Sequence, residues 1–291
     1  MGIFNKFFKK KDAIRKREGN PDVYDLPNEN ERMNWGMEKA RLTLHYFEKC
    51  LANPKMGQDT FSIKARLEEN GKVEHIWLLD PTFDNQGNLF GIVGNEPIDI
   101  TNVVFDQKIG ITREYISDWL IVENGRLIGG YTIRAIRDGL SGNALQDFDK
   151  NLGGMLVDDG EDYFEPNFDT PEGAVLVLED AYDLDDIEKA IDCKNFYREA
   201  EMMLKKSVEI ELDDNLITKV AETLRLSFLK SLQENGMPKF KGVIRAFKRQ
   251  FITDQHCILT EICYYPDGSK SEQKLNTYKE NDEWKVLSPE N

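Results

Sequence analysis

Side chains of the kinds found in active sites gather in one short stretch, SDWLIVENGRLIGGYTIR, which covers residues 117–134. Its notable members are Asp118, Trp119, Gly129, Gly130, Tyr131, Thr132 and Arg134. A pair of glycines directly before a helix can expose backbone N–H groups to an anion. The structural alternative is a glycine bend that turns the chain from a strand into a helix. The alternation of residues up to the glycines favours the bend.

An acid and two arginines decide what this stretch could bind. Arg134 and Arg137 lie nearly one helical turn apart and follow Asp118 in the chain. The arginines either form ion pairs with Asp118 or are available to bind an anionic ligand. Neighbouring strand residues point to opposite sides, so Trp119 is expected in the core. Asp118 and Thr132 are then expected to cap nearby backbone groups.

Three further side chains are candidates for ligand binding. His75 shares a strand face with Trp77 and could titrate in a cleft, although a strand histidine is more often simply packed and hydrogen-bonded. Arg245 and Arg249 share a face with two phenylalanines, an arrangement that suits an anionic ligand. The commoner meaning of that pattern is an outward face whose arginine side chains extend to water.

No motif points to catalysis or to a cofactor. The sequence has no phosphate-binding loop, HExxH or G-x-S-x-G. His256 and Glu261 fall on opposite sides of one predicted strand, which disfavours an acid–base pair. The four cysteines form no CxxC pair and do not stand at zinc-ligand spacing from the three histidines. The acidic run at 158–160 does not fit a calcium loop. We therefore expect no metal, no cofactor and no enzymatic activity.

The composition narrows the partners. The chain of 291 residues carries 53 acidic and 38 basic residues, a net charge of −15. This balance argues against nucleic acid, whose phosphates require clustered Lys and Arg, and is compatible with a basic protein partner. Unpaired cysteines fit a reducing, cytoplasmic setting. No apolar run approaches the ~20 residues of a membrane span.

The first residues differ in charge from the rest. Residues 1–17 hold seven Lys or Arg and one acid, and apolar side chains recur among them at helical spacing. Such a segment is typical of weak contact with an anionic membrane surface, here the inner face of the membrane. The residues concerned are Phe4, Phe7, Phe8, Lys9, Lys10 and Lys11. The alternative is a tail, or a helix that docks on the protein itself.

The elements that must position the candidates follow a linker within residues 1–29. Apolar residues from Met33 to Leu51 draw one helical stripe. The period then changes to two, and Asn70-Gly71 and Asn124-Gly125 predict hairpin turns. Strands are expected near 61–67, 73–79, 88–94, 98–105, 108–112, 117–122 and 126–131. Thr132 is the expected N-cap of a helix to residue 140, and a short helix resumes before residue 152.

Several landmarks in order resemble one bacterial family. They are His75-Ile76-Trp77, Gly91, Asn95-Glu96-Pro97, Ser117-Asp118-Trp119 and Gly129-Gly130-Tyr131-Thr132-Ile133-Arg134. Residues 30–153 resemble the domain of unknown function 2314, the YegJ-like proteins. The resemblance implies fold membership and carries over no activity.

A second domain follows an acidic linker at 154–168. Thr170-Pro171 is a typical helix start, and helices are expected near 171–182, 184–191, 194–206 and 215–234. Four alternating strands follow, near 241–252, 255–265, 270–279 and 283–288. This order, with the opening TPEGAVLVLEDAYDLDDIEKAIDCKNF and the closing YKENDEWKV, resembles the nuclear-transport-factor-two-like (NTF2-like) superfamily over 169–291. That fold hosts enzymes, carriers and dimerisation modules, so it implies no single function.

We therefore expect an α+β protein of two domains, a helix on a curved antiparallel sheet and then an NTF2-like cone. A non-enzymatic interaction protein, of adaptor or immunity type, fits the acidic body and the missing catalytic motifs. The alternative is small-molecule binding or hydrolysis in the cavity of the cone.

Overall fold

A computed structural model describes residues 14–15, 23–24, 31–86, 88–158, 160–207 and 213–289. The chain is a mixed α/β protein with antiparallel sheets and divides into two compact units, Met1–Glu161 and Asp162–Asn291. The division falls inside the predicted linker. The basic segment at residues 1–11 lies outside the described residues, so its contact with a membrane stays a prediction.

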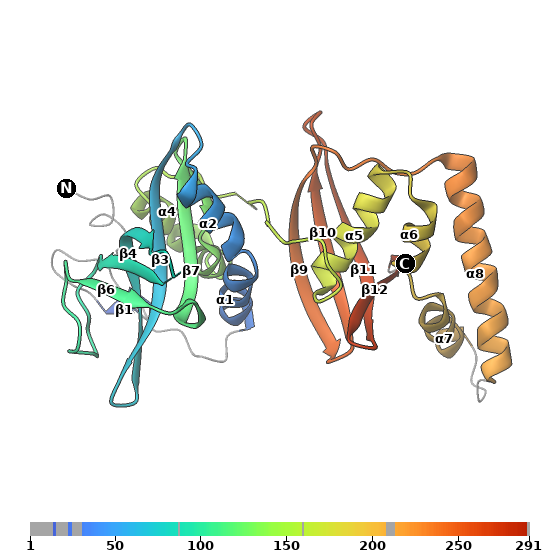
Figure 1. Ribbon diagram of the computed structural model, residues 1–291, viewed down its shortest axis with the longest axis horizontal. Helices are drawn as coiled ribbons and strands as arrows, with labels where there is room; N and C mark the ends of the chain where they lie inside the picture. The colour runs from blue at the N-terminus through green and yellow to red at the C-terminus, as the bar shows by residue number, and fades with distance from the viewer. Residues whose placement is uncertain are drawn as a thin grey trace. The chain divides into compact units, whose positions relative to one another are not determined.

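The first unit is built on a six-stranded sheet with the order β6-β5-β4-β3-β7-β8 (Figure 1). Its elements are β1 Ile14–Arg15, β2 Val23–Tyr24, α1 Glu31–Leu42, α2 Leu44–Ala52, β3 Gln58–Glu69, β4 Lys72–Phe83, β5 Leu89–Val93, β6 Lys108–Ile111, η2 Arg113–Tyr115, β7 Ile116–Glu123, β8 Arg126–Gly129, α3 Tyr131–Arg137 and α4 Gly142–Asn151. The predicted strand at 98–105 is wrong, because this segment forms bends and turns.

Both predicted hairpins are confirmed. Asn70 and Gly71 join β3 to β4 with φ angles of 52° and 78°, and Asn124 and Gly125 join β7 to β8 with 50° and 77°. Two consecutive residues with positive φ are what a two-residue hairpin turn requires, which is why Asn-Gly is favoured there. These turns set the register of β3 with β4 and of β7 with β8.

Strand β7 is the most buried strand of the first unit, because helices cover both of its faces. Trp119 packs against Phe47 of α2, with ring centroids 5.6 Å apart. On the other face Leu120 joins Phe148 and Leu152, which belong to α4 and its C-terminal end. Every candidate residue on β7 is therefore inside the protein.

The predicted single helix over 33–51 is two helices. The indole of Trp119 donates to the carbonyl of Ala40 at 3.0 Å and lies 3.2 Å from the hydroxyl of Thr43. In a continuous helix the amide of Leu44 would bond to that carbonyl. A side-chain donor inserted into the helical ladder breaks the helix at this point.

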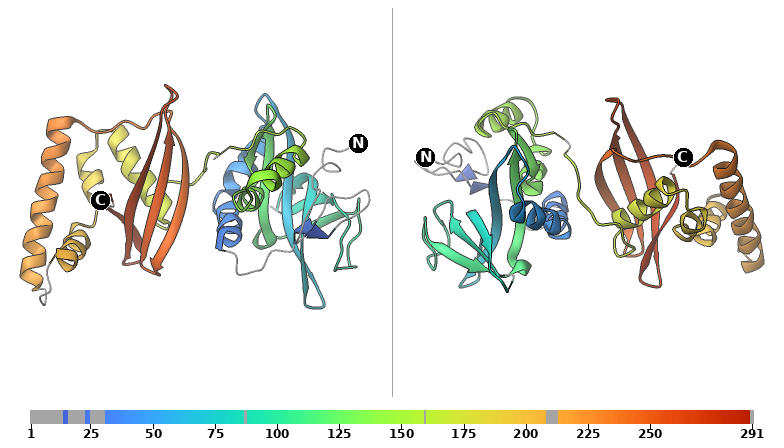
Figure 2. Two further views of the ribbon diagram at one scale, coloured as in Figure 1. Left: turned by 180° about the vertical axis from the view of Figure 1, so that it is seen from behind. Right: turned by 45° about the horizontal axis from the view of Figure 1, so that its top comes forward.

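The second unit is a four-stranded antiparallel meander with the order β12-β11-β10-β9, and α5 packs on it (Figure 2). Its elements are α5 Pro171–Asp183, α6 Ile187–Asp192, α7 Phe196–Ser207, α8 Asp214–Asn235, β9 Ile244–Thr253, β10 His256–Tyr264, β11 Lys270–Glu280 and β12 Glu283–Pro289. The expected helix start is confirmed, since the Thr170 side chain accepts from the amide of Gly173 at 3.0 Å. Among the described helices, none is both long and apolar enough to cross a membrane.

Candidate functional site

Asp118 lies under the N-terminus of α3 and is fully buried. Its carboxylate accepts from the amides of Tyr131 at 3.0 Å and Thr132 at 2.8 Å, and from the Thr132 hydroxyl at 2.5 Å. It also accepts from the amide of Trp119 at 2.8 Å. Because a helix start has amides without helical partners, a carboxylate there is stabilising. The expectation that Asp118 caps backbone groups is confirmed.

Lys64 of β3 is the cation of this buried set. Its Nζ lies 3.3 Å from the hydroxyl of Thr132, and Lys64 pairs with Asp118 across β3 and β7. Burial raises the pKa of Asp118, and the Thr132 hydrogen bonds and the nearby Lys64 lower it in part. Burial lowers the pKa of Lys64, and Asp118 raises it in part. The arrangement stabilises the strand-to-helix corner and leaves the carboxylate no free face.

The paired glycines form the predicted bend. Gly129 and Gly130 have φ angles of 67° and 61°, and a Cβ on Gly129 would lie 2.5 Å from the Trp119 ring. The amide of Gly130 donates to the carbonyl of Trp119 at 2.7 Å. Since the next two amides donate to Asp118, the bend offers no amide cradle to an anion. The expectation that Thr132 is the N-cap is wrong, because Gly130 occupies that position.

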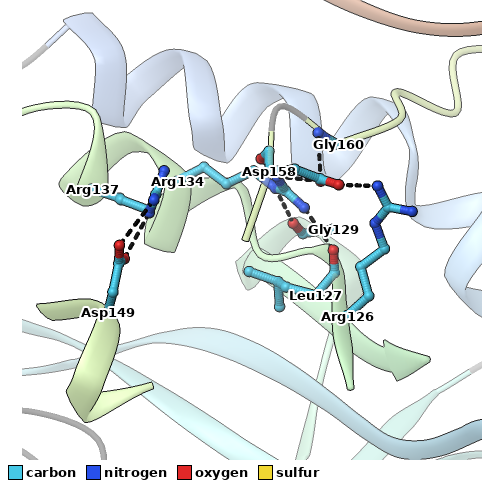
Figure 3. A network of polar contacts seen from close by, with 8 residues as sticks. All are labelled: Arg126, Leu127, Gly129, Arg134, Arg137, Asp149, Asp158 and Gly160. Carbon is cyan, nitrogen blue, oxygen red and sulfur yellow. Dashed lines mark hydrogen bonds and ion pairs between the residues drawn. The ribbon is translucent and has the colours of Figure 1, made fainter. Parts of the chain in front are cut away.

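The two arginines of α3 bond to partners other than Asp118, and Figure 3 shows these contacts. Arg134 donates to the carbonyls of Gly129 at 2.8 Å and Leu127 at 2.6 Å, and to that of Asp158. Arg137 makes two bonds to the Asp149 carboxylate, at 2.7 and 2.9 Å. These bonds join α3 to β8, to α4 and to the start of the predicted linker. Ion pairs from Arg126 and Arg134 to the Asp158 carboxylate also hold this part of the acidic linker.

His75 belongs to an open cavity of the first unit with a volume of about 240 Å³. Its Nδ1 lies 2.8 Å from Ser117 Oγ, and that hydroxyl lies 3.1 Å from the carbonyl of Lys64. Burial, followed by the charges of Lys64 and Arg66, lowers the pKa of His75 to about 4. The imidazole is therefore neutral at pH 7. Its cavity is also lined by Asn34, Met37, Arg41, Arg66, Val73, Glu114, Tyr115 and Ile116.

This cavity is suited to recognition and poorly suited to nucleophilic catalysis. When the Ser117 hydroxyl donates to the backbone carbonyl, His75 Nδ1 must be the protonated nitrogen that donates to Ser117. A histidine in that state cannot accept the serine proton, and a pKa near 4 makes it a weak base at pH 7. The cations Arg41 and Arg66 line the same cavity and suit a carboxylate or phosphate group.

In the second unit both candidate arginines face inward, so the expected outward face is wrong. Arg249 of β9 bonds to both oxygens of Glu172 on α5, each at 2.8 Å, and the two side chains are 6% and 0% exposed. Arg245 contacts Glu179 of α5 and lies 3.8 Å from Glu261 of β10. Because α5 covers this face of the sheet, the two arginines form buried ion pairs with acidic residues of α5.

Two buried carboxyl groups share the cation of Arg245. Glu179 and Glu261 are 2% and 0% exposed. Burial, then the Glu261 carboxylate, raise the pKa of Glu179 to about 10. The thiol of Cys263 lies in the same cluster, and burial raises its pKa to about 12. His256 lies on the other side of β10 and pairs with Asn276 at 2.9 Å, as its predicted separation from Glu261 requires.

Comparison with known proteins supports the first resemblance. Residues 30–155 match the family model described as "Uncharacterized protein conserved in bacteria (DUF2314)". The match supports the resemblance predicted for residues 30–153, and it includes Asp118, the glycine bend and the His75 cavity.

Two relatives share parts of the chain. "Uncharacterized protein YegJ" of Escherichia coli (strain K12) is 42% identical over 79 residues, 27% of this chain and 51% of the relative. The chain thus spans about half the length of that relative. "Putative ankyrin repeat protein NMB1133/NMB1171" of Neisseria meningitidis serogroup B (strain ATCC BAA-335 / MC58) is 28% identical over 185 residues, 61% of this chain and 68% of the relative. Since 61% of 291 residues exceeds the 161 residues of the first unit, that similarity reaches beyond the DUF2314 domain.

No solved structure matches the chain. The NTF2-like assignment of the second unit therefore stays a prediction, based on its order of elements.

Sequence patterns missed several residues of these sites. Ser117, Arg41 and Arg66 come from three elements and meet only around the cavity. Glu172 lies in the first turn of α5 and Glu179 about two turns later, and neither had a visible partner in the sequence. Their one available signal was a spacing of seven, which places two acids on the apolar, core-facing side of a helix.

Proposed function

We propose that the chain is a non-enzymatic binding protein whose DUF2314 domain recognises a carboxylate of a protein partner in the His75 cavity. One observation carries the proposal, namely that the cavity brings two cationic donors together from separate elements. Arg41 and Arg66 provide these donors, the paired His75 and Ser117 also line the cavity, and Met37 and Val73 add apolar surface. Precisely placed donors on a mainly apolar lining are typical of ligand sites.

The size of the cavity favours a single group over a whole small molecule. Drug-sized ligands occupy pockets of roughly 300–1,000 Å³. At about 240 Å³ the cavity suits a side chain or a chain terminus. The pair between Arg66 and Glu68 is 38% and 50% exposed, and such exposed pairs contribute only about 0–1 kcal/mol. An incoming carboxylate can therefore replace Glu68 at little cost.

The proposal of a non-enzymatic role is supported by the contacts that the reactive side chains make within the fold. Asp118 caps α3, and Arg134 and Arg137 bond within the first unit. The neutral His75 donates to Ser117 and does not activate it. An adaptor or immunity role would use such a cavity to hold a partner, and the net charge of −15 favours a basic surface around the bound carboxylate.

We also propose that the protein is cytoplasmic, because cysteines without disulfide partners fit a reducing compartment. Cys50, Cys193, Cys257 and Cys263 are all free and buried. Hydrolysis or small-molecule binding in the second unit, the alternative from the sequence, stays a prediction. The ion pairs between α5 and the sheet occupy the face it would need.

An NMR titration tests the proposal with a short peptide that ends in a free carboxylate and the same peptide amidated. We expect the free acid to shift the amide signals of Arg66, His75 and Ser117, and the amidated peptide to leave them in place. Arg66→Gln should abolish the shifts. Arg225→Gln, which removes an exposed arginine paired with Glu222 in the second unit, is the matched control. Equal shifts with both peptides, or none at millimolar concentration, would refute the proposal.

A further inference from the structure

We propose that Glu179, Glu261 and Cys263 form a zinc-type metal site between α5 and β10 of the second unit. This inference is independent of the His75 cavity, which belongs to the other unit. One carboxylate oxygen of each glutamate and the sulfur of Cys263 lie within 4.8 Å of one another. All three side chains are buried.

The distances require only a small movement. Zinc binds carboxylate oxygen at about 2.0–2.2 Å and thiolate sulfur at about 2.3 Å, which places the ligand atoms of a tetrahedral site about 3.5 Å apart. Ligand atoms now within 4.8 Å must close by roughly one ångström, which side-chain rotation can supply. A thiolate beside carboxylates favours zinc over magnesium or calcium.

Unsatisfied buried atoms point into this cluster and are the second observation. Both carboxylate oxygens of Glu179, Oε1 of Glu261 and Nε of Arg245 are buried without a hydrogen-bond partner. The contact of Arg245 with Glu179 therefore lacks hydrogen-bond geometry. Buried polar atoms nearly always have partners, so several unsatisfied acceptors in one place indicate a missing cation or proton.

The neighbours hold the carboxylates in the orientation that a metal needs. Gln273 donates to Oε2 of Glu261 at 2.7 Å, and Oε1 is left toward the cluster. Arg245 contacts Oε2 of Glu179 as an ion pair. Neighbours that hold the ligating side chains in place orient the ligands in known metal sites. A water molecule would complete the fourth position.

Charge balance also supports a divalent ion. When both carboxyl groups are ionised, they face the single guanidinium of Arg245, and one negative charge in a buried site then lacks a counter-charge. A divalent metal with a Cys263 thiolate brings the sum of −3, +1 and +2 to zero. A proton shared by the two carboxyl groups would balance the pair as well, and metal uptake distinguishes the two arrangements. Metal binding would use all three side chains as ligands.

Metal analysis of the full chain, purified without a histidine tag, tests the proposal. We expect one zinc ion per chain after incubation with zinc and gel filtration, and a sulfur-to-cobalt charge-transfer band when Co²⁺ replaces zinc. Cys263→Ser should abolish the band and lower zinc affinity by more than the about 10- to 100-fold cost of losing an outer partner. Glu261→Gln should lower the affinity similarly.

Cys257→Ser is the matched control, because Cys257 is a free, buried cysteine on the same face of β10. It should leave both the zinc content and the cobalt band unchanged. Circular dichroism shows whether each variant folds. A folded wild-type chain that takes up no zinc would overturn the proposal and leave the shared proton. Equal loss of the cobalt band in both cysteine variants, or retention of zinc affinity in Cys263→Ser, would overturn it as well.

Discussion

Replacing Asp118 by alanine should destabilise the first unit strongly. The substitution removes the acceptor of four hydrogen bonds, three of them from the backbone amides of Trp119, Tyr131 and Thr132. Bonds to a charged group contribute about 1.5–3 kcal/mol each, and a buried donor left without a partner costs about 1–3 kcal/mol. The terms are not additive because the bonds share one carboxylate. We expect a loss of about 3–5 kcal/mol, the range for breaking a buried pair.

Urea denaturation and calorimetry measure this loss. For a unit of this size, 1 kcal/mol shifts the melting temperature by about 2–4 °C, so a decrease of roughly 6–20 °C is expected. The transition of the second unit serves as an internal reference. Asp59→Ala, which removes an exposed acid from β3, should change stability by no more than about 0.5 kcal/mol.

Substitution of Lys64 tests whether the negative charge of Asp118 contributes to stability separately from its hydrogen bonds. In the Asp118→Asn background, Lys64→Met should recover part of the stability, because the lysine no longer has its acidic neighbour. In the wild-type background the same change should destabilise the unit. If Asp118→Ala unfolds within about 1 kcal/mol of wild type, the capping argument is wrong and a binding role for Asp118 returns.

Three further outcomes follow from the contacts described above. Gly129→Ala should cost about 3 kcal/mol in urea denaturation, because it combines a positive φ with a clash against Trp119. Stability should fall as pH drops from 6.5 toward 4, since His75 binds its proton near 6.5 when unfolded and near 4 when folded. His75→Gln should remove that part of the pH dependence of the urea midpoint. Glu172→Gln should cost about 3–5 kcal/mol, and adding Arg249→Met should recover most of it, because the buried guanidinium is then no longer left without its carboxylate.

Local patterns predicted most elements of the fold because their causes are local. Asn70-Gly71 and Asn124-Gly125 make hairpin turns through their own preference for positive φ. The Thr170 side chain caps α5 by accepting a hydrogen bond from the backbone amide three residues further on. Elements whose shape depends on distant residues were not predictable in this way. The break between α1 and α2 depends on the indole of Trp119, far along the chain.

The amino-acid sequence by itself determined the DUF2314 resemblance, the hairpins and the glycine bend, since each depends on residues close together in the chain. Only the tertiary structure decided which polar side chains bond within the fold and which line a cavity. The Asp118 carboxylate accepts hydrogen bonds from the start of the helix α3, whereas His75 lies beside Ser117 in a cavity that two arginines also line. Glu179 meets Glu261 and Cys263 because α5 packs on β10. Spacing along the chain carries no information about such meetings, because packing brings together side chains that dozens of residues separate.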